Sequence, residues 1–301
     1  MFKTLGVKSN FLGIEDKYSS YKKSRVIILP VTYERTVSYG GGTRNGPGAI
    51  LKASHYVEFY DEETERQVYR ELGIATLSPL NLRKVRNDKE ALEQVRKVTR
   101  KLVADEKFVI TLGGEHTISQ ATIAAHLEKF PDLSVLQIDA HSDLRMEYQQ
   151  SKFSHACVMA RIVEFIDPRK IVQVGIRAQC IEESEFIRNS RITTLYAHEI
   201  RSGKYTKVSK SWYDYAIGRL SPHVYVTFDV DGLDPAVMPS TGTPEPNGLF
   251  WDETMRLLRQ LGSKKMVVGC DVVELAPLKG LHHPDLTAAR LVSKMINYFI
   301  Y

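Results

Sequence analysis

The chain has 301 residues, of which 43% are apolar and 26% are charged. These fractions are those of an ordinary globular protein and exclude a disordered or collagen-like chain. The net charge of +5 is spread over 41 basic and 36 acidic residues, and the basic pairs are short and flank apolar runs. This pattern argues against a nucleic-acid partner. No stretch approaches the roughly 18 apolar residues of a membrane-spanning helix, so we expect no membrane association.

The cysteines point to a reducing compartment. Cys157, Cys180 and Cys270 are odd in number and form no Cys-x-x-Cys pair, which argues against a disulfide framework. The N-terminal residues include no continuous apolar segment of the kind found in a secretory signal. We therefore predict a cytoplasmic protein with buried free thiols.

Short runs rich in valine and isoleucine alternate with longer amphipathic stretches. This alternation predicts an α/β fold in which helices cover both faces of a parallel sheet. The predicted strands are 25–30, 107–112, 133–139, 171–176, 192–195, 223–229 and 265–272. The predicted helices are 87–105, 117–129, 251–261 and 286–298.

Asn87 is the predicted cap of the first of these helices, and Asp285 or Thr287 that of the last. No internal repeat or linker interrupts the chain. We therefore expect one domain over residues 1–301, with an N-terminal extension over 1–24.

Four of the predicted strands end in acidic residues or histidine. The four segments are Gly-Gly-Glu-His at 113–116, Asp-Ala-His-Ser-Asp at 139–143, Asp-Val-Asp at 229–231 and Asp-Val-Val-Glu at 271–274. In open parallel sheets, ligands bind beyond the carboxyl ends of the strands. We therefore expect these segments to meet in one crevice.

Such a crevice needs positive charge. Side chains two residues apart share one face of an extended strand, so Asp139, His141 and Asp143 point the same way. Asp229 and Asp231 do the same on the later strand. Buried carboxylates that lie together repel one another unless a cation compensates. Singly, a glycine turn, an aspartate cap or one histidine has a structural explanation, but their joint position at strand ends favours a metal site.

The count of charges indicates two metal ions, because the charge of −4 on four aspartates is balanced by the charge of +4 on two divalent cations. Two ions about 3.5 Å apart would lower the pKa of a shared water and hold it as a nucleophile near neutral pH. Aspartate and histidine ligands without thiolate suit manganese, iron or zinc, and the carboxylate-rich set favours manganese.

Three of these motifs resemble those of a known family. Gly-Gly-Glu-His-Thr, Asp-Ala-His-Ser-Asp and Phe-Asp-Val-Asp-Gly-Leu-Asp-Pro are similar, in this order, to the metal motifs of the ureohydrolases, which include arginase and agmatinase. Similar segments also stand at 46–50, 241–246 and 271–274, and the resemblance runs from about residue 25 to the end. It implies an arginase-like three-layer α/β/α sandwich with a mainly parallel central sheet, two Mn²⁺ per subunit, a guanidino substrate, and a homotrimer or homohexamer.

The resemblance also implies a ligand set. One manganese ion would be bound by His116, Asp139, Asp143 and Asp229. The other would be bound by His141, Asp139, Asp229 and Asp231, so that Asp139 and Asp229 bridge the two ions.

Two further residues have catalytic and substrate-binding roles in this comparison. Glu274 stands where the family places the acid that holds the guanidinium, a planar cation that a carboxylate binds in bidentate geometry. His155 stands at the position of the loop histidine, which is suited to protonate the leaving amine near pH 7. The alternatives are a surface glutamate beside Pro277 and a histidine that only begins a helix.

The substrate depends on loops. An arginine-specific site must satisfy an α-carboxylate and an α-ammonium. Where arginases have an asparagine for this purpose, the chain has Arg145, and the arginase Ser-Gly-Asn run before His155 is absent. The Asp-Leu-Arg run and the later Phe-Ser-His-Ala are similar to agmatinases, so we expect hydrolysis of agmatine to putrescine and urea, a step of polyamine biosynthesis that leads on to spermidine.

Other substrates and functions stay open at this point. N1-aminopropylagmatine, guanidinobutyrate and formiminoglutamate are substrates of similar enzymes, and Glu147 is either a partner for a distal ammonium or an ordinary solvated residue. A metal-dependent deacetylase would need a catalytic pair of histidines, but we expect His282 and His283 at a helix entrance. A catalytically inactive metal-binding regulatory oligomer would need neither His155 nor Glu274. The glycines at 40–42 lack a P-loop lysine, so we expect a lip over the pocket or a turn.

Overall fold

The computed structural model describes residues 2–82 and 85–300, and its centre is one sheet of eight strands. The strands are β1 (Val26–Val31), β2 (Ile74–Thr76), β3 (Phe108–Gly113), β4 (Ser134–Ile138), β5 (Ile171–Ile176), β6 (Thr193–Tyr196), β7 (His223–Asp229) and β8 (Met266–Val273). Their order is β2-β1-β3-β8-β7-β4-β5-β6, and every pairing is parallel. The seven predicted strands are confirmed. The sequence analysis missed β2, because three residues are too few to show a pattern.

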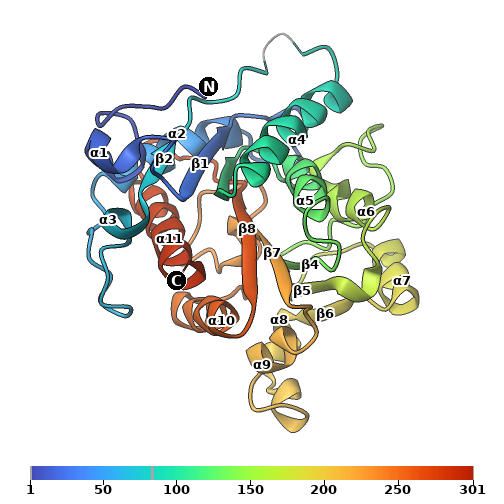
Figure 1. Cartoon of the computed structure of the whole chain (residues 1–301). Helices are drawn as coiled ribbons and strands as arrows, with labels where there is room; N and C mark the ends of the chain where they lie inside the picture. The colour runs from blue at the N-terminus through green and yellow to red at the C-terminus, as the bar shows by residue number, and fades with distance from the viewer. Residues whose placement is uncertain (1, 83–84, 301) are drawn as a thin grey trace.

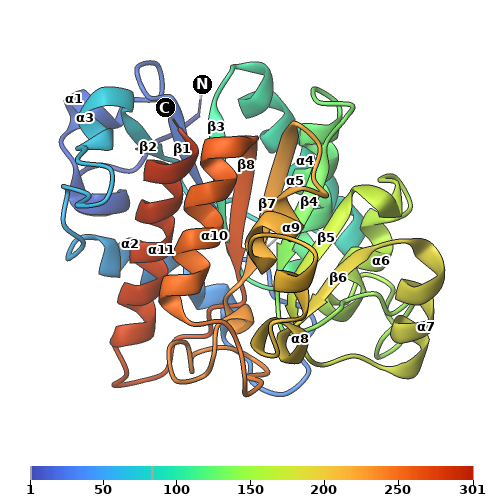
Figure 2. The same ribbon diagram turned by 90° about the horizontal axis from the view of Figure 1, so that it is seen from below.

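Helices cover both faces of the sheet (Figures 1 and 2). One layer contains α2 (Gly46–Ser54), α10 (Trp251–Lys264) and α11 (His283–Phe299), and the other contains α4 (Asp88–Ala104), α5 (Ser119–Leu127) and α6 (Val158–Ile162). Shorter helices are α1 (Asp16–Ser19), α3 (Val68–Leu72), α7 (Ile181–Ser190), α8 (Ala197–Arg201) and α9 (Trp212–Ile217). The predicted three-layer sandwich is confirmed, and the sheet is parallel throughout.

The core explains why the strands are apolar at every position. Neighbouring residues of a strand face opposite sides of the sheet. Accordingly, Ile28 of β1 belongs to the same buried cluster as Leu258 and Met295 of the α10 and α11 layer. Ile27 belongs to the cluster that contains Val95 of α4. Both faces of β1 are therefore shielded from solvent, as expected for a strand of a parallel sheet between two helical layers.

The helix ends agree with the prediction at one helix and not at the other. Asn87 caps α4, and its side-chain oxygen accepts a hydrogen bond from the Glu90 N–H at 2.9 Å. The C-terminal helix begins at His283, before both predicted caps, so that prediction was wrong. Pro284 in the first turn explains the earlier start, because proline suits a position whose N–H needs no partner. His282 and His283 lie at the helix entrance, as expected.

The N-terminal extension packs against the sheet edge. The Leu5 N–H donates to the Thr76 carbonyl at 2.8 Å, the Phe11 N–H donates to the Thr76 hydroxyl at 2.8 Å, and the Phe11 and Ile14 side chains are buried.

The three cysteines are free. Cys157 and Cys270 are buried as predicted, whereas Cys180 is only partly buried. Within residues 2–82 and 85–300, the structure contains no helix with the length and apolar character of a membrane span.

Helices α10 and α11 lie side by side (Figures 1 and 2). Gly262 of α10 lies against the backbone of α11. A Cβ atom at Gly262 would lie 2.0 Å from the Tyr298 carbonyl oxygen of α11. We predict that Gly262→Ala lowers the free energy of unfolding by about 1–3 kcal/mol, because the two helices must move apart. Urea denaturation measures this change.

Gly48→Ala is the matched control. Gly48 is an exposed residue of α2, and a Cβ atom there would have no atom within 4 Å. Alanine should raise the stability by up to about 1 kcal/mol there, since glycine is the poorer helix former. Equal gains in stability for both variants would contradict the close contact between α10 and α11.

Candidate metal centre

The four strands that carry the predicted motifs are neighbours at the centre of the sheet, in the order β3-β8-β7-β4. β7 and β8 are the last two strands along the chain, and in the sheet they lie between β3 and β4. Four segments that are distant in the sequence therefore meet at one edge. A pocket opens at the carboxyl ends of these strands. Its lining includes the predicted residues His141, Asp143, His155, Asp229, Asp231 and Glu274. His116 and Asp139 are completely buried.

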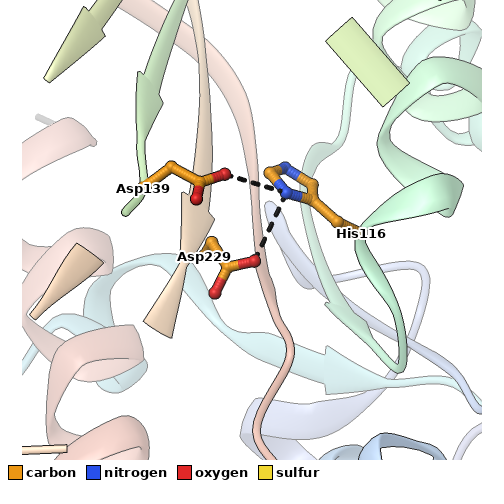
Figure 3. A group of neighbouring side chains, drawn as sticks. All are labelled: His116, Asp139 and Asp229. Atoms are coloured by element: carbon orange, nitrogen blue, oxygen red, sulfur yellow. Dashed lines mark ion pairs between the residues drawn. The ribbon is translucent and has the colours of Figure 1, made fainter. Parts of the chain in front are cut away.

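The buried histidine faces three carboxylates. His116 Nδ1 lies 3.2 Å from Asp139, 3.1 Å from Asp143 and 3.4 Å from Asp229, in each case from Oδ2. Figure 3 shows the Asp139 and Asp229 carboxylates, from the ends of β4 and β7, turned toward the His116 ring. This is a group of side chains with the spacing of a metal site.

A second group of the same kind adjoins the first. His141 Nδ1 lies 2.9 Å from Asp231 Oδ2 and 3.7 Å from Asp139 Oδ1. Asp139 thus directs one oxygen to each histidine, the arrangement needed for a bridging ligand. All six predicted ligands converge.

The orientation of the His116 ring follows from hydrogen bonds below it. His116 Nε2 lies 2.8 Å from the Thr227 hydroxyl, which donates to the buried Asp271 carboxylate at 2.7 Å. Since Thr227 gives its only proton to Asp271, its oxygen accepts one from Nε2. The other ring nitrogen, Nδ1, has no hydrogen-bond partner besides the carboxylates and is free to bind a cation.

The pKa values of three of the predicted ligands reflect the negative charge gathered in the site. Burial, followed by the charges of Asp231 and Asp139, raises the pKa of Asp229 well above its ordinary value. Burial and Asp139 raise the pKa of Asp143 to about 7. Although burial opposes it, Asp231 and Asp139 raise the pKa of His141 to about 12. Divalent ions bound among these side chains would lower the pKa values of the aspartates and displace the proton from His141. The donor set therefore fits the predicted metal ions.

Glu274 directly follows β8 and has a positive φ of 64°. Its N–H donates to the Gly114 carbonyl at 2.8 Å, and its Oε1 accepts from the His116 N–H at 2.6 Å. The residue lines the pocket, so the alternative of a surface glutamate is wrong. Burial, with the nearby charge of Glu115, raises the pKa of Glu274 well above its ordinary value, and a bound guanidinium would counter this effect.

His155 begins a short 3-10 helix and also faces the pocket. Its Nδ1 lies 2.9 Å from the Thr36 hydroxyl and its Nε2 lies 2.8 Å from the Ser38 hydroxyl. Burial lowers the pKa of His155 to about 4, and the charges of His116 and His141 act in the same direction.

Several contributing residues were missed in the sequence. The Arg177 guanidinium donates to the Asp231 carbonyl at 2.6 Å and to the Glu245 carbonyl at 2.9 Å, which holds the Asp231 turn in place. Neither contact has a sequence signal, because backbone carbonyls occur at every residue. Asp271 and Glu115 did have one, since each stands inside a motif already identified.

The loops around the pocket agree in part with the sequence analysis. The glycine segment forms a lip, in which the Gly40 N–H donates to the Gly242 carbonyl at 2.9 Å. Glu147 is exposed and lies outside the pocket lining, so it is a solvated residue.

The whole chain was compared with known proteins. Residues 24–297 match the model of the arginase family. The chain is 37% identical to the N(1)-aminopropylagmatine ureohydrolase of Synechocystis over 286 residues, which cover 93% of this chain and 91% of the relative. The chain belongs to the arginase family. Ureohydrolases of this family hydrolyse amidine C–N bonds, and this chain is one of them.

Two other arginase-family relatives carry a different substrate in their names. The agmatinase of Bacillus cereus is 32% identical, with 93% of each chain covered. The crystal structure of the agmatine ureohydrolase of Thermoplasma volcanium has a TM-score of 0.83 at 28% identity, with 93% of this chain and 91% of that chain covered. The predicted family and fold are confirmed.

The Thr227 hydroxyl offers a test of the arginase-family site that does not require a substrate. We predict that Thr227→Val weakens manganese binding about 10- to 100-fold, because the His116 ring loses its acceptor. Thr227→Ser keeps the hydroxyl and should retain most of the affinity. Titration with manganese measures both, and thermal melting verifies folding. Equal affinity in the valine variant would show that the hydroxyl does not orient His116.

Proposed function

We propose that this ureohydrolase cleaves agmatine to putrescine and urea at a pair of manganese ions. The observation that carries the proposal is the pair of adjoining acid and histidine groups joined by Asp139, with Glu274 and His155 on the wall of the same pocket. A catalytically inactive regulatory protein would have no use for these last two side chains.

The proposed ligands are those implied by the sequence. His116, Asp139, Asp143 and Asp229 would hold one ion, and His141, Asp139, Asp229 and Asp231 the other. When bound, two such ions supply a water activated for attack on the guanidinium carbon. The buried carboxylates supply the negative charge that keeps both ions in place.

The protein's own side chains would handle the two ends of the bond that breaks. Glu274, which lines the pocket, would bind the guanidinium and orient its carbon toward the pocket floor. When the C–N bond to the alkyl chain breaks, the leaving nitrogen needs a proton, and His155 on the pocket wall would supply it.

The other residues that line the pocket indicate which chemical group the far end of the substrate carries. Arg145 is the one Lys or Arg among the described lining residues, and its side chain is already held by Glu183 at 3.9 Å and by the Tyr148 ring at 5.0 Å. A substrate carboxylate would have to compete with Glu183 for Arg145, which disfavours arginine and guanidinobutyrate.

N1-aminopropylagmatine is the second candidate. Glu147 lies outside the lining, so a distal ammonium would stay hydrated at the mouth of the pocket, where a longer chain also fits. The name of the Synechocystis relative supports this substrate. We also propose that the protein is cytoplasmic and assembles as a homotrimer or homohexamer. Light scattering of the purified protein tests the number of subunits.

Urea release by the manganese-loaded protein tests the substrate. We expect urea from agmatine or aminopropylagmatine and at least tenfold less from arginine, guanidinobutyrate and formiminoglutamate, because an uncompensated carboxylate costs at least about 1.4 kcal/mol. Asp229→Ala, which removes a bridging carboxylate, should release none. A higher kcat/KM for aminopropylagmatine would keep the mechanism and change the substrate. No urea from any of these compounds, with two ions bound, would contradict the proposed reaction.

Glu274→Gln tests the guanidinium contact. The variant keeps the shape of the side chain and loses its charge, so we expect kcat/KM for agmatine to fall about 10- to 100-fold. Metal content, measured by elemental analysis, should stay at two ions. Glu147→Gln removes an exposed acid outside the pocket and should leave kcat/KM within about twofold. An equal loss in both variants would refute a specific role for Glu274.

A further inference from the structure

Glu115 lies beside the pocket and holds the segment that carries Thr36. Its side chain is 1% exposed and is absent from the pocket lining. Oε2 accepts from the backbone N–H groups of Arg35 and Thr36, each at 2.7 Å. Oε1 accepts from the Thr36 hydroxyl at 3.0 Å and from the Thr117 hydroxyl at 2.7 Å. One carboxylate thus fixes both the main chain and the hydroxyl of Thr36.

The Thr36 hydroxyl lies between Glu115 and His155 and has one proton to give. Its oxygen is 2.9 Å from His155 Nδ1 and accepts from the His155 backbone N–H at 3.1 Å. A proton directed at Nδ1 would leave two oxygens facing each other 3.0 Å apart with no hydrogen between them. A proton directed at Glu115 lets the Thr36 oxygen accept from both N–H groups of His155, so all three contacts become hydrogen bonds.

The other nitrogen of the ring has a different partner. His155 Nε2 lies 2.8 Å from the hydroxyl of Ser38, an exposed residue of the pocket lining. That hydroxyl donates to Nε2 when the ring is neutral and accepts from it when the ring is charged. We propose that Glu115 and Thr36 are positioning residues that keep a proton on His155 Nδ1, so that Nε2 is the nitrogen that exchanges protons with the substrate.

The consequence for catalysis rests on the proposed function. When the C–N bond breaks, its electron pair stays with the leaving nitrogen, which takes the Nε2 proton of the charged ring, the minor form near pH 7 because burial lowers the pKa of His155. His155 is left neutral, with a lone pair on Nε2 and its proton still on Nδ1. A water molecule that enters the site then returns a proton to Nε2 and is left as the hydroxide that the next turnover needs. A ring free to adopt either neutral form would present the wrong nitrogen to the pocket for part of the time.

The position of the proton is measured without any substrate. Nitrogen-15 and proton correlation spectra are recorded at neutral pH on histidine-labelled protein loaded with zinc, a diamagnetic ion that suits the same ligands. His155→Asn identifies the signals of His155 by their loss. We expect a proton on Nδ1 and none on Nε2, and Ser38→Ala should leave this unchanged. A proton on Nε2 and a bare Nδ1 in the unmodified protein would overturn the proposal.

Substitutions at Thr36 and Glu115 test the direction of the Thr36 hydroxyl proton. Thr36→Val removes the acceptor and should give a mixture of the two neutral forms, whereas Thr36→Ser should behave as the unmodified protein. If Thr36→Val fails to fold, Glu115→Gln tests the same contact. Its amide N–H donates to the Thr36 oxygen, so the threonine proton must turn toward Nδ1 and the ring proton should move to Nε2. An unchanged Nδ1 proton in a folded Glu115→Gln protein would also overturn the proposal.

Kinetics separate the positioning role from the proposed reaction. In the manganese-loaded enzyme, Thr36→Val should lower kcat about 10- to 100-fold with little change in KM, and Thr36→Ser should restore most of the loss. A shifted proton with unchanged kcat would refute the role in catalysis. If no guanidine yields urea but the spectra change as expected, the positioning of His155 stands and the proposed function fails.

Discussion

Four aspartates gathered in a buried crevice are the constraint on which the rest of this structure depends. Their mutual repulsion and lost hydration would be prohibitive without compensating cations. The fold keeps them together because each stands at or just beyond the end of a parallel strand, and β7 and β8 are inserted between β3 and β4. The sheet is buried between two helical layers. The packing of this core therefore contributes free energy that helps to hold the charged groups close together.

The same arrangement of polar groups occurs twice around the crevice. Asp271 receives the proton of Thr227, which leaves the Thr227 oxygen to accept from His116. The buried Glu115 receives the proton of a second threonine, Thr36, which leaves the Thr36 oxygen to accept from His155. In each case an acid that touches no ligand decides which nitrogen of a histidine is free. In the proposed mechanism, this would leave the first histidine able to bind a cation and the second able to transfer a proton.

The part of this structure that follows local rules was predictable from the sequence. Strand positions, the Asn87 cap and the place of each acid at its own strand end all depend on residues close together in the chain, and the general rule for parallel sheets then brings the strand ends together. Short elements such as β2 carry too few residues for a pattern, and Pro284 moved a helix start that the spacing of polar residues had suggested. The Thr36 contact with His155 joins residues 119 positions apart, and no spacing rule connects them.

The division between the reacting end and the tail of the substrate has the same physical origin. In the proposed function, charged groups at strand ends would hold the reacting end, and a displaced carboxylate there would lose its compensation and destabilise the whole centre. The tail would meet loop residues such as Val37, Tyr148 and Thr243, which lie outside the buried core and can change at small cost. Relatives named for agmatine and for aminopropylagmatine each match 93% of this chain. Under the proposed function, the choice between these two substrates would therefore rest on the few neutral side chains at the mouth of one pocket, where the added aminopropyl group would lie.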